Sequence, residues 1–341
     1  MPEPETSSRA QRLGRILPGV TLAVAIAVVA SVIGAFAPIV GGPVAGIVLG
    51  VVFGSIRRPG PVLQPGVRFA SRFVLQLSVV LLGAQLSLAQ VARVGVESLP
   101  VMLGTLVICL VAAWLIGRAL GIVGNLRTLI GVGTGICGAS AIAAVTPVIG
   151  AVGVEVAYAV STIFLFNVAA VIVFPLIGHA LGMSQEAFGL FAGTAVNDTS
   201  SVVAAASTYG ALAANHAVVV KLVRTLMIIP VCLGLAWVVG RRATADAPGR
   251  RVRVVRLVPW FLVGFVVVAA VNSLGLIPGG AHPALQAAAV FLITVALSAI
   301  GLSTDVAAFR VAGPRPLLLG GSLWVIVSAA SLGLQAVTGL V

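Results

Sequence analysis

Long apolar segments alternate with short polar stretches along almost the whole chain. A helix needs about 20 mostly apolar residues to cross the hydrocarbon core of a bilayer. Eleven segments meet this length, and the pattern predicts transmembrane helices at about 18–36, 39–55, 73–90, 99–118, 128–149, 156–178, 187–208, 216–239, 257–276, 284–303 and 317–338. The predicted fold class is an all-α polytopic membrane protein.

Composition and charge support this class. The chain is 60% hydrophobic and 8% charged, and its mean hydropathy is +1.20. Soluble domains of this size do not have that balance. The net charge of +12 could indicate a nucleic-acid partner in a soluble protein, but here the arginines lie between apolar segments. We therefore read the charge as membrane topology and expect no nucleic acid.

The basic residues set the expected orientation. If the N-terminus is cytoplasmic, 17 of the 20 basic residues fall at inner ends of the spans, as the positive-inside rule requires. We expect a cytoplasmic tail at 1–17, a transmembrane transporter domain at 18–338 that includes an inner loop at 240–256, and an outer C-terminus.

The seventh span carries an unusual polar cluster at its centre. Its sequence, GLFAGTAVNDTSSVVAAA, places Asn197, Asp198, Thr199, Ser200 and Ser201 in succession. An ionisable group at this depth is costly and usually functional. Asn, Asp, Ser and Thr also cap helix ends better than they continue helices. The cluster therefore predicts a discontinuous helix that carries a binding site.

The fifth span resembles the seventh at an offset of sixty residues. Gly133-Thr134 and Ser140 correspond to Gly193-Thr194 and Ser200, within a shared pattern G-T-x-[IV]-x-x-x-S-x-[IV]-x-A. Two interrupted spans of this kind indicate the midplane site of a transporter with inverted repeats. With eleven crossings, however, these two spans run in the same direction, whereas an inverted repeat needs opposite directions.

Asp198 is the first candidate site residue. Its carboxyl group could bind and release a proton during transport, or it could serve only to cap the helix break. The neighbouring polar residues either line the site or satisfy the broken backbone. The same two interpretations apply to Thr134, Cys137, Ser140 and Thr194.

Lys221 and Arg224 lie one helical turn apart in the eighth span, and Lys221 is the chain's single lysine. We place both near the outer end of that span. They could extend to the lipid headgroups, as long basic side chains often do. Alternatively, they form a cationic pair at the mouth of a substrate path or a partner for Asp198, either of which suits an anionic substrate.

The sequence lacks the motifs that mark the common classes of enzyme. The chain has no nucleotide-binding Walker sequence, no nucleophile elbow and no metal-ligand or redox-cofactor motif. We expect neither an enzyme nor a cofactor.

A series of glycines lies on the second span. Gly42, Gly46, Gly50 and Gly54 recur at four-residue spacing, which predicts a helix face for close packing.

Three segments carry a family resemblance. GTGICGASAIAAVTPVI, GTAVNDTSSVVAA and KLVRTLMIIPV occur in this order. Together they resemble the YeiH-like bacterial membrane proteins, a family named for sulfate export within the superfamily of cation/proton antiporters and anion transporters. The resemblance implies inverted repeats, broken crossing helices, secondary active transport and the bacterial inner membrane. By analogy with related folds, it also implies a homodimer.

One position departs from the family motif. The motif has His before the Asp, whereas this chain has Asn197. Histidine titrates near neutral pH and asparagine does not. The chain must then rely on Asp198 alone or couple to another ion. An Asn-Asp pair is also similar to the motif of some sodium/proton antiporters.

Three functions therefore stay open. The first is ion-coupled export of a small anion, such as sulfate or an organic sulfur compound, with H⁺ or Na⁺ as the coupling ion. The second is a cation/proton antiporter that uses Asn197 and Asp198. The third is a membrane scaffold or sensor that transports nothing. Replacement of Asp198 separates the scaffold from the two transporters, since in a scaffold it would change only stability and never ion flux.

Overall fold

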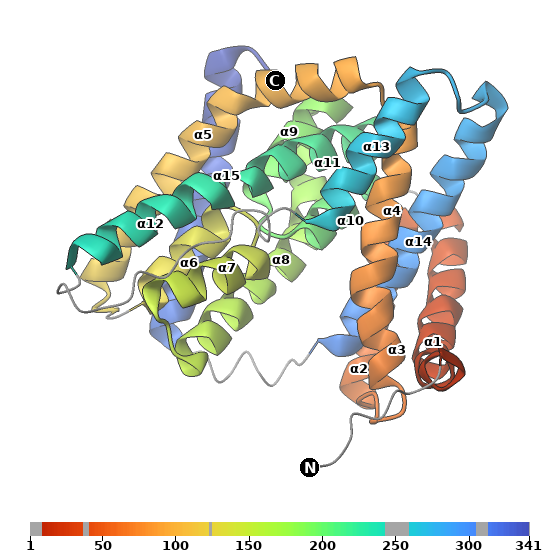
Figure 1. The fold of residues 1–341 in the computed structure, drawn as a ribbon, viewed down its shortest axis with the longest axis horizontal. Helices are drawn as coiled ribbons and strands as arrows, with labels where there is room; N and C mark the ends of the chain where they lie inside the picture. Colours follow the sequence, from red (N-terminus) through yellow and green to blue (C-terminus); the bar gives the residue numbers. More distant parts are fainter. Residues whose placement is uncertain (1–8, 37–40, 123–124, 243–258, 305–312, 341) are drawn as a thin grey trace. The chain divides into compact units, whose positions relative to one another are not determined.

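The computed structural model describes residues 9–36, 41–122, 125–242, 259–304 and 313–340. These residues are helical apart from short connections, so the prediction of an all-α polytopic membrane protein is confirmed (Figure 1). Each of the eleven predicted ranges contains helix. Seven helical segments are long and apolar enough to cross a membrane alone. The remainder of the predicted inner loop, 243–256, and tail residues 1–8 lie outside the described residues.

The chain divides into two compact units. Unit 1 consists of residues 1–82 and 277–306, and unit 2 consists of residues 83–276 and 307–341. In unit 1 the helices are α1 (Arg9–Phe36), α2 (Gly41–Ile56), α3 (Gln64–Phe69), α4 (Leu75–Leu82) and α14 (His282–Ser303), with a π-helical turn at Ala70–Val74. Helix α1 thus begins inside the predicted tail.

Glycines bring α2 and α14 of unit 1 into close backbone contact. A β-carbon at Gly50 would lie 2.4 Å from the carbonyl oxygen of Ser298, and one at Gly301 would lie 2.4 Å from that of Ile47. Neither position has room for a side chain. The prediction that the glycine series on the second span serves packing is confirmed for Gly46, Gly50 and Gly54, which all face α14.

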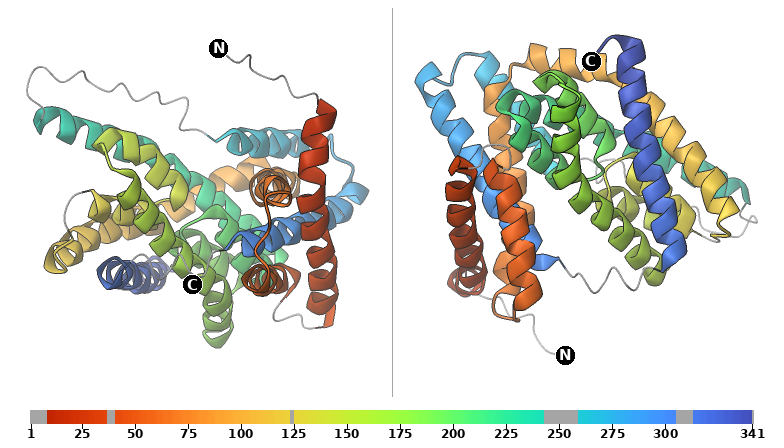
Figure 2. Two further views of the ribbon diagram at one scale, coloured as in Figure 1. Left: turned by 90° about the horizontal axis from the view of Figure 1, so that it is seen from below. Right: turned by 180° about the vertical axis from the view of Figure 1, so that it is seen from behind.

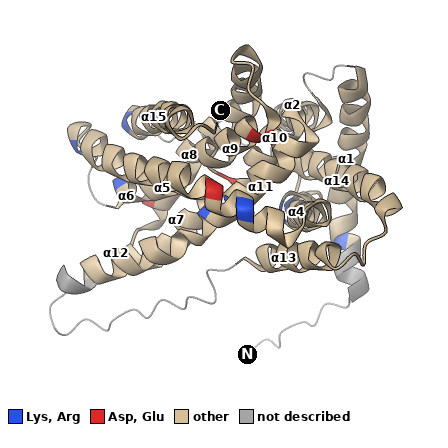
Figure 3. Cartoon of the chain, turned by 90° about the horizontal axis from the view of Figure 1, so that it is seen from above, with Lys and Arg blue, Asp and Glu red and all other residues tan. Residues whose placement is uncertain are grey.

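Unit 2 is larger and contains the interrupted segments. Its helices are α5 (Leu88–Ala119), α6 (Leu126–Gly135), α7 (Ala139–Ile149), α8 (Gly153–Ala180), α9 (Gln185–Ala195), α10 (Thr199–Tyr209), α11 (Ala211–Leu226), α12 (Ile228–Arg242), α13 (Trp260–Ser273) and α15 (Pro314–Thr338). Figure 2 shows the same helices from below and from behind. Lys, Arg, Asp and Glu positions are sparse along the helices (Figure 3).

Helices α6 and α7 form a hairpin that returns to the end from which it starts. The Glu155 carboxylate accepts hydrogen bonds from the backbone N–H of Asn125, just before α6, and from that of Val152, just after α7, both at 3.0 Å. One side chain thus holds the beginning and the end of the segment together. The predicted fifth span therefore re-enters instead of crossing.

Helices α9 and α10 form a second hairpin of the same kind. The Tyr209 hydroxyl at the end of α10 donates to the carbonyl oxygen of Met183, just before α9, at 2.6 Å. Gln185, at the start of α9, accepts from the backbone N–H of Leu212 and Ala213 at the start of α11. The predicted seventh span therefore also re-enters.

The two hairpins enter unit 2 from opposite ends. Helix α8, with 28 residues, connects the base of the first hairpin to the base of the second. At 1.5 Å per residue it is about 40 Å long, enough to cross a bilayer, whereas the hairpin helices of 10 or 11 residues reach only about 15 Å. Each tip therefore lies about halfway through the membrane.

This geometry corrects the predicted direction of the two segments. As crossings they would run the same way, but as hairpins from opposite ends they run in opposite directions, as an inverted repeat requires. The offset of sixty residues places α7 on α10 and extends through α8, which corresponds to α11 and α12. The predicted fifth and seventh spans no longer cross the membrane. Because their number is even, the arginine clusters keep the side of the membrane on which the sequence analysis placed them.

The packing of α2 on α14 predicts the effect of added volume. We expect Gly50→Ala to lower the free energy of unfolding by about 1–3 kcal/mol, because backbone must move to admit the methyl group. Gly333→Ala on α15 is the control, since nothing lies within 4 Å of its added β-carbon. Thermal unfolding of the purified variants in detergent measures both, and equal melting temperatures would contradict the prediction.

Candidate functional site at the hairpin tips

The tips of the two hairpins meet in the interior of unit 2. Gly138 lies between α6 and α7 with a φ of +68°, and a β-carbon there would lie 3.2 Å from the Cβ of Asp198. Asp198 lies in the equivalent break between α9 and α10. Glycine suits the first break both because of its left-handed backbone and because of this close neighbour.

Two buried cations on α11 hold the tips together. Lys221 and Arg224 are both fully buried. The Lys221 ammonium donates to the carbonyl oxygens of Ile136 at 2.7 Å and Val196 at 2.9 Å, one in each break. Each of these carbonyls follows a half-helix that ends inside the protein, where no helical partner remains for it.

Arg224 makes the same connection one turn further along α11. Its guanidinium donates to the carbonyl oxygens of Gly135 at 2.8 Å and Thr134 at 3.1 Å, and to that of Thr194. Thr134 and Thr194 are sixty residues apart, as are Ile136 and Val196. Each cation therefore binds one equivalent pair of carbonyls, and the sequence echo coincides with a structural equivalence.

These contacts correct the predicted position of the basic pair. Lys221 and Arg224 do not extend to headgroups, and they do not lie at an outer mouth. Helix α11 begins at Ala211, earlier than the predicted start at 216, so Lys221 lies about 15 Å into the membrane. Arg93 and Glu97 on α5 form an exposed ion pair, in which neither buried cation takes part.

Asp198 caps the second half of its hairpin. It lies at the N-cap of α10, where one carboxylate oxygen, Oδ2, accepts from the backbone N–H of Ser201 at 3.1 Å and from the Ser200 hydroxyl. Its other oxygen, Oδ1, is buried and has no hydrogen-bond partner among the described residues. Asp198 thus has both a structural contact and an unsatisfied acceptor.

Asn197 is bound through its backbone and open at its side chain. Its N–H donates to Oδ1 of Asn167 on α8 at 3.1 Å. The Asn197 side-chain oxygen is buried without a partner in the described part of the chain. Two adjacent residues therefore each present an unsatisfied oxygen at one tip.

The other predicted site residues lie at different depths. Thr134, Cys137 and Thr194 are buried, Thr199 and Ser200 are half-buried, and Ser140 is exposed at the start of α7. Thr134 and Thr194 face the cations through their backbone carbonyls and not through their hydroxyl groups. The N-cap residue of α7 is Gly138, which has no side chain to cap the helix.

Helix α15 supplies two further polar residues that the sequence analysis missed. The Ser331 hydroxyl lies 2.7 Å from that of Thr194, and the Gln335 amide donates to Ser331 at 3.1 Å. Both side chains are buried. Their spacing of four residues was a usable signal, since it places them on one face of α15.

Comparison with known proteins gives a consistent result. Residues 18–320 match the family described as conserved hypothetical protein 698. The chain is similar to a UPF0324 membrane protein of Streptococcus mutans, with 39% identity over 81% of this chain and 84% of the relative. It is 42% identical to one of Streptococcus pneumoniae strain R6, over 82% of this chain and 84% of the relative. The chain belongs to this family of membrane proteins.

No solved structure matches the chain. The hairpin geometry of this chain therefore rests on the hydrogen bonds described above. The expected YeiH-like resemblance is confirmed by the family match.

The carbonyl contacts of Arg224 predict a large effect of a conservative change. Arg224→Lys keeps the charge, but one ammonium group cannot replace a guanidinium that reaches three carbonyls across two hairpins. Because an unsatisfied buried carbonyl costs about 1–3 kcal/mol, we expect unfolding free energy to fall by at least about 2 kcal/mol. Arg93→Lys, in an exposed pair, is the control and should change it by less than about 0.5 kcal/mol. Similar melting temperatures for both variants would refute the bracing role.

Proposed function

We propose that the chain is a secondary active transporter that moves a small anion through the region where the two hairpin tips meet. The observation that supports this proposal is that two hairpins, which enter from opposite ends and reach half depth, meet at a pair of buried cations. Interrupted helices related by inverted repeats characterise transporter sites at the membrane midplane. A static membrane protein gains no stability from two breaks and two buried charges.

The charge balance at the tips favours an anion. Lys221 and Arg224 contribute two positive charges and Asp198 one negative charge. The four half-helix ends contribute about half a charge each, two of either sign, and these cancel. The site then has a net charge of about +1, which a bound anion would neutralise.

The N-terminus of α7, which has no N-cap side chain, supplies suitable ligands for that anion. Half-helix N-termini offer backbone N–H groups and a positive dipole to anionic substrates. Helix α7 has no side-chain cap, and Ala139 and Ser140 at its start are exposed. The Ser140 hydroxyl adds a donor beside these N–H groups. Sulfate or an organic sulfur compound, as the resemblance implies, has oxygens for such donors.

Asp198 is the proposed coupling residue. Its Oδ1 oxygen has no partner and is buried, so a proton on it would remove a costly unsatisfied charge. Protonation would also raise the net charge at the tips and strengthen anion binding. We propose H⁺ as the coupling ion, with Na⁺ as the alternative, and anion export across the bacterial inner membrane from an inside N-terminus. We further propose that the protein works as a homodimer.

A cation/proton antiporter is the second candidate function. Two adjacent unsatisfied oxygens, on Asn197 and Asp198, are the kind of ligands that Na⁺ or a proton requires. Against this candidate, Lys221 and Arg224 already occupy the backbone carbonyls that such a cation would use. The anion transporter is therefore the better supported function.

Replacement of Asp198 by Asn tests the proposal. Asn also caps helices well, so the fold should persist while the titratable group is lost. We expect anion-dependent proton movement in proteoliposomes that contain the wild type. With Asp198→Asn, we expect proton movement to fall to the level of protein-free vesicles. Glu97→Gln, which removes an exposed carboxylate of the same unit, is the control and should keep full flux.

The assay offers sulfate, sulfite, thiosulfate and taurine, then Na⁺ and K⁺, under an imposed pH gradient. Proton movement that depends on Na⁺ or K⁺ instead of an anion would support the second candidate. A folded wild type that moves none of these ions would favour the scaffold. Full flux in Asp198→Asn would remove Asp198 from the coupling role.

A further inference from the structure

Lys221 does not use all of its hydrogen-bond donors at the hairpin tips. An ammonium group has three N–H donors. Lys221 gives two of them to the carbonyl oxygens of Ile136 and Val196, and the third meets no acceptor among the described residues. Because Lys221 is fully buried, water at the surface does not take this donor either. It is therefore available to a ligand that enters between the tips.

Asp198 divides its two carboxylate oxygens between two tasks. Oδ2 caps α10 by accepting from the backbone N–H of Ser201. Oδ1 is buried and has no partner in the part of the chain that the structure describes. A proton can therefore bind to Oδ1 while Oδ2 keeps the cap. The charge of Asp198 can then change without a rearrangement of the helix break.

The tips contain two fixed positive charges and one carboxylate. The charged groups that act on Lys221 are Arg224 and Asp198. The other acidic residues in the described part of unit 2 lie in an exposed ion pair or in the first turns of α8 and α9, and they are Glu97, Glu155 and Glu186. The net charge at the tips is therefore +1 when Asp198 is ionised and +2 when it is protonated.

Two further titratable side chains lie near Lys221. Cys137, in the first tip, has a buried thiol, which contributes no charge. His216 precedes Lys221 on α11 and is half-buried beside α9, where a β-carbon at Gly189 would lie 2.8 Å from its Cβ. Neither is placed in a helix break beside an unsatisfied oxygen, as Asp198 is.

Electrical neutrality links the charge of a bound anion to the state of Asp198. An uncompensated charge near the centre of a bilayer is costly. A dianion neutralises the two cations only if Asp198 carries a proton, because an ionised Asp198 would leave one negative charge in excess. A monoanion neutralises them together with an ionised Asp198, because a protonated Asp198 would leave one positive charge in excess.

We propose that the charge of the transported anion decides whether a proton travels with it. Dianionic oxyanions such as sulfate and thiosulfate bind with one proton on Oδ1 of Asp198, and monoanionic sulfonates such as methanesulfonate bind without one. In both cases the transported species together carry one negative charge, which an inside-negative membrane potential drives outward. These stoichiometries rest on the transport function proposed above.

Reversal potentials in proteoliposomes test the proposal. When one charge is transported, a tenfold anion gradient is balanced by about 59 mV. We expect this slope for sulfate and for methanesulfonate. A gradient of one pH unit should shift the reversal potential of sulfate by about 59 mV more, because one proton accompanies it. The same gradient should leave the reversal potential of methanesulfonate unchanged.

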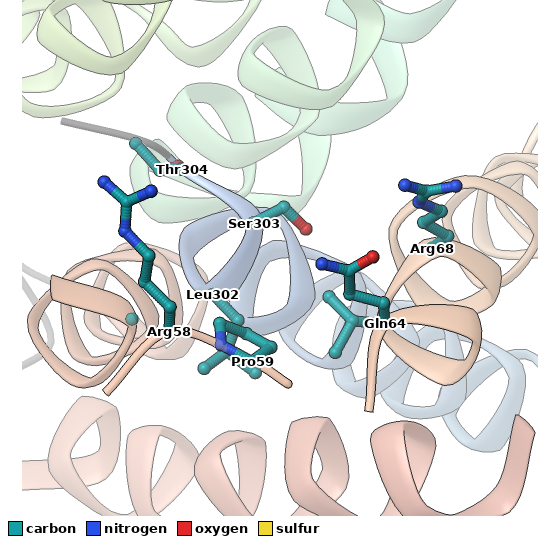
Figure 4. A pocket seen from close by; sticks show the side chains of 9 residues that line it. Arg58, Pro59, Gln64, Arg68, Leu302, Ser303 and Thr304 are labelled. Carbon is teal, nitrogen blue, oxygen red and sulfur yellow. The ribbon is translucent and has the colours of Figure 1, made fainter. Parts of the chain in front are cut away.

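Asp198→Asn should remove the proton from the cycle. Sulfate should then carry two charges, so that about 30 mV balances a tenfold gradient and the pH gradient has no effect. Glu97→Gln, the matched loss of an exposed carboxylate, should keep both wild-type slopes. Arg68→Gln should keep them as well, since it removes an exposed arginine that lines a cavity of unit 1 (Figure 4).

The outcomes separate this proposal from the proposed function. Equal pH shifts for sulfate and methanesulfonate would overturn the proposal but leave anion transport in place. So would about 30 mV per tenfold sulfate gradient in the wild type. A wild type that moves no anion would overturn the proposed function as well. If Asp198→Asn does not fold, the wild-type slopes for the two anions decide the question.

Discussion

The constraint that governs unit 2 is the satisfaction of backbone carbonyls in the middle of a membrane. A helix that ends there leaves carbonyl groups without partners, and lipid offers them no hydrogen bonds. Two half-helices, α6 and α9, end in this way, and Lys221 and Arg224 donate to the carbonyls of both. The carbonyl dipoles stabilise the charge of both cations. The meeting of the two tips therefore depends on one turn of α11.

The two halves of the repeat are equivalent in shape but not in chemistry. Positions 134 and 136 match 194 and 196 as carbonyl sources. Both cations, however, come from α11, while the corresponding helix α8 contributes Asn167 instead. Likewise, Gly138 in the first tip stands opposite Asp198 in the second. One tip thus provides a glycine that admits close approach and a helix without an N-cap side chain, and the other provides the ionisable group.

The sequence analysis found the breaks and the key carboxylate but not the path of the chain. Five polar residues in succession at mid-span are costly enough to identify a break without any structure. The re-entrant path of these two segments could not be predicted from the sequence, because two half-helices joined by a short turn have the same length and hydropathy as one crossing helix. The signals that decide it are single side chains, Glu155 and Tyr209, whose partners are far away in sequence. Lys221 was misplaced for the same reason, since the depth of a residue follows from where its helix starts.

Asn197 stands where the motif of the resembled family has a histidine, and this difference bears on the proposed coupling. Its backbone N–H is held by Asn167, which fixes the chain at the break whatever the side chain is. Its side-chain oxygen is unsatisfied and cannot titrate, so any proton taken up at this tip must go to Asp198. A histidine here would add a second titratable group and a further positive charge beside two cations. Under the proposed function, the charge at the tips would change by a single proton, and the state of Asp198 would be tied to the binding of an anion.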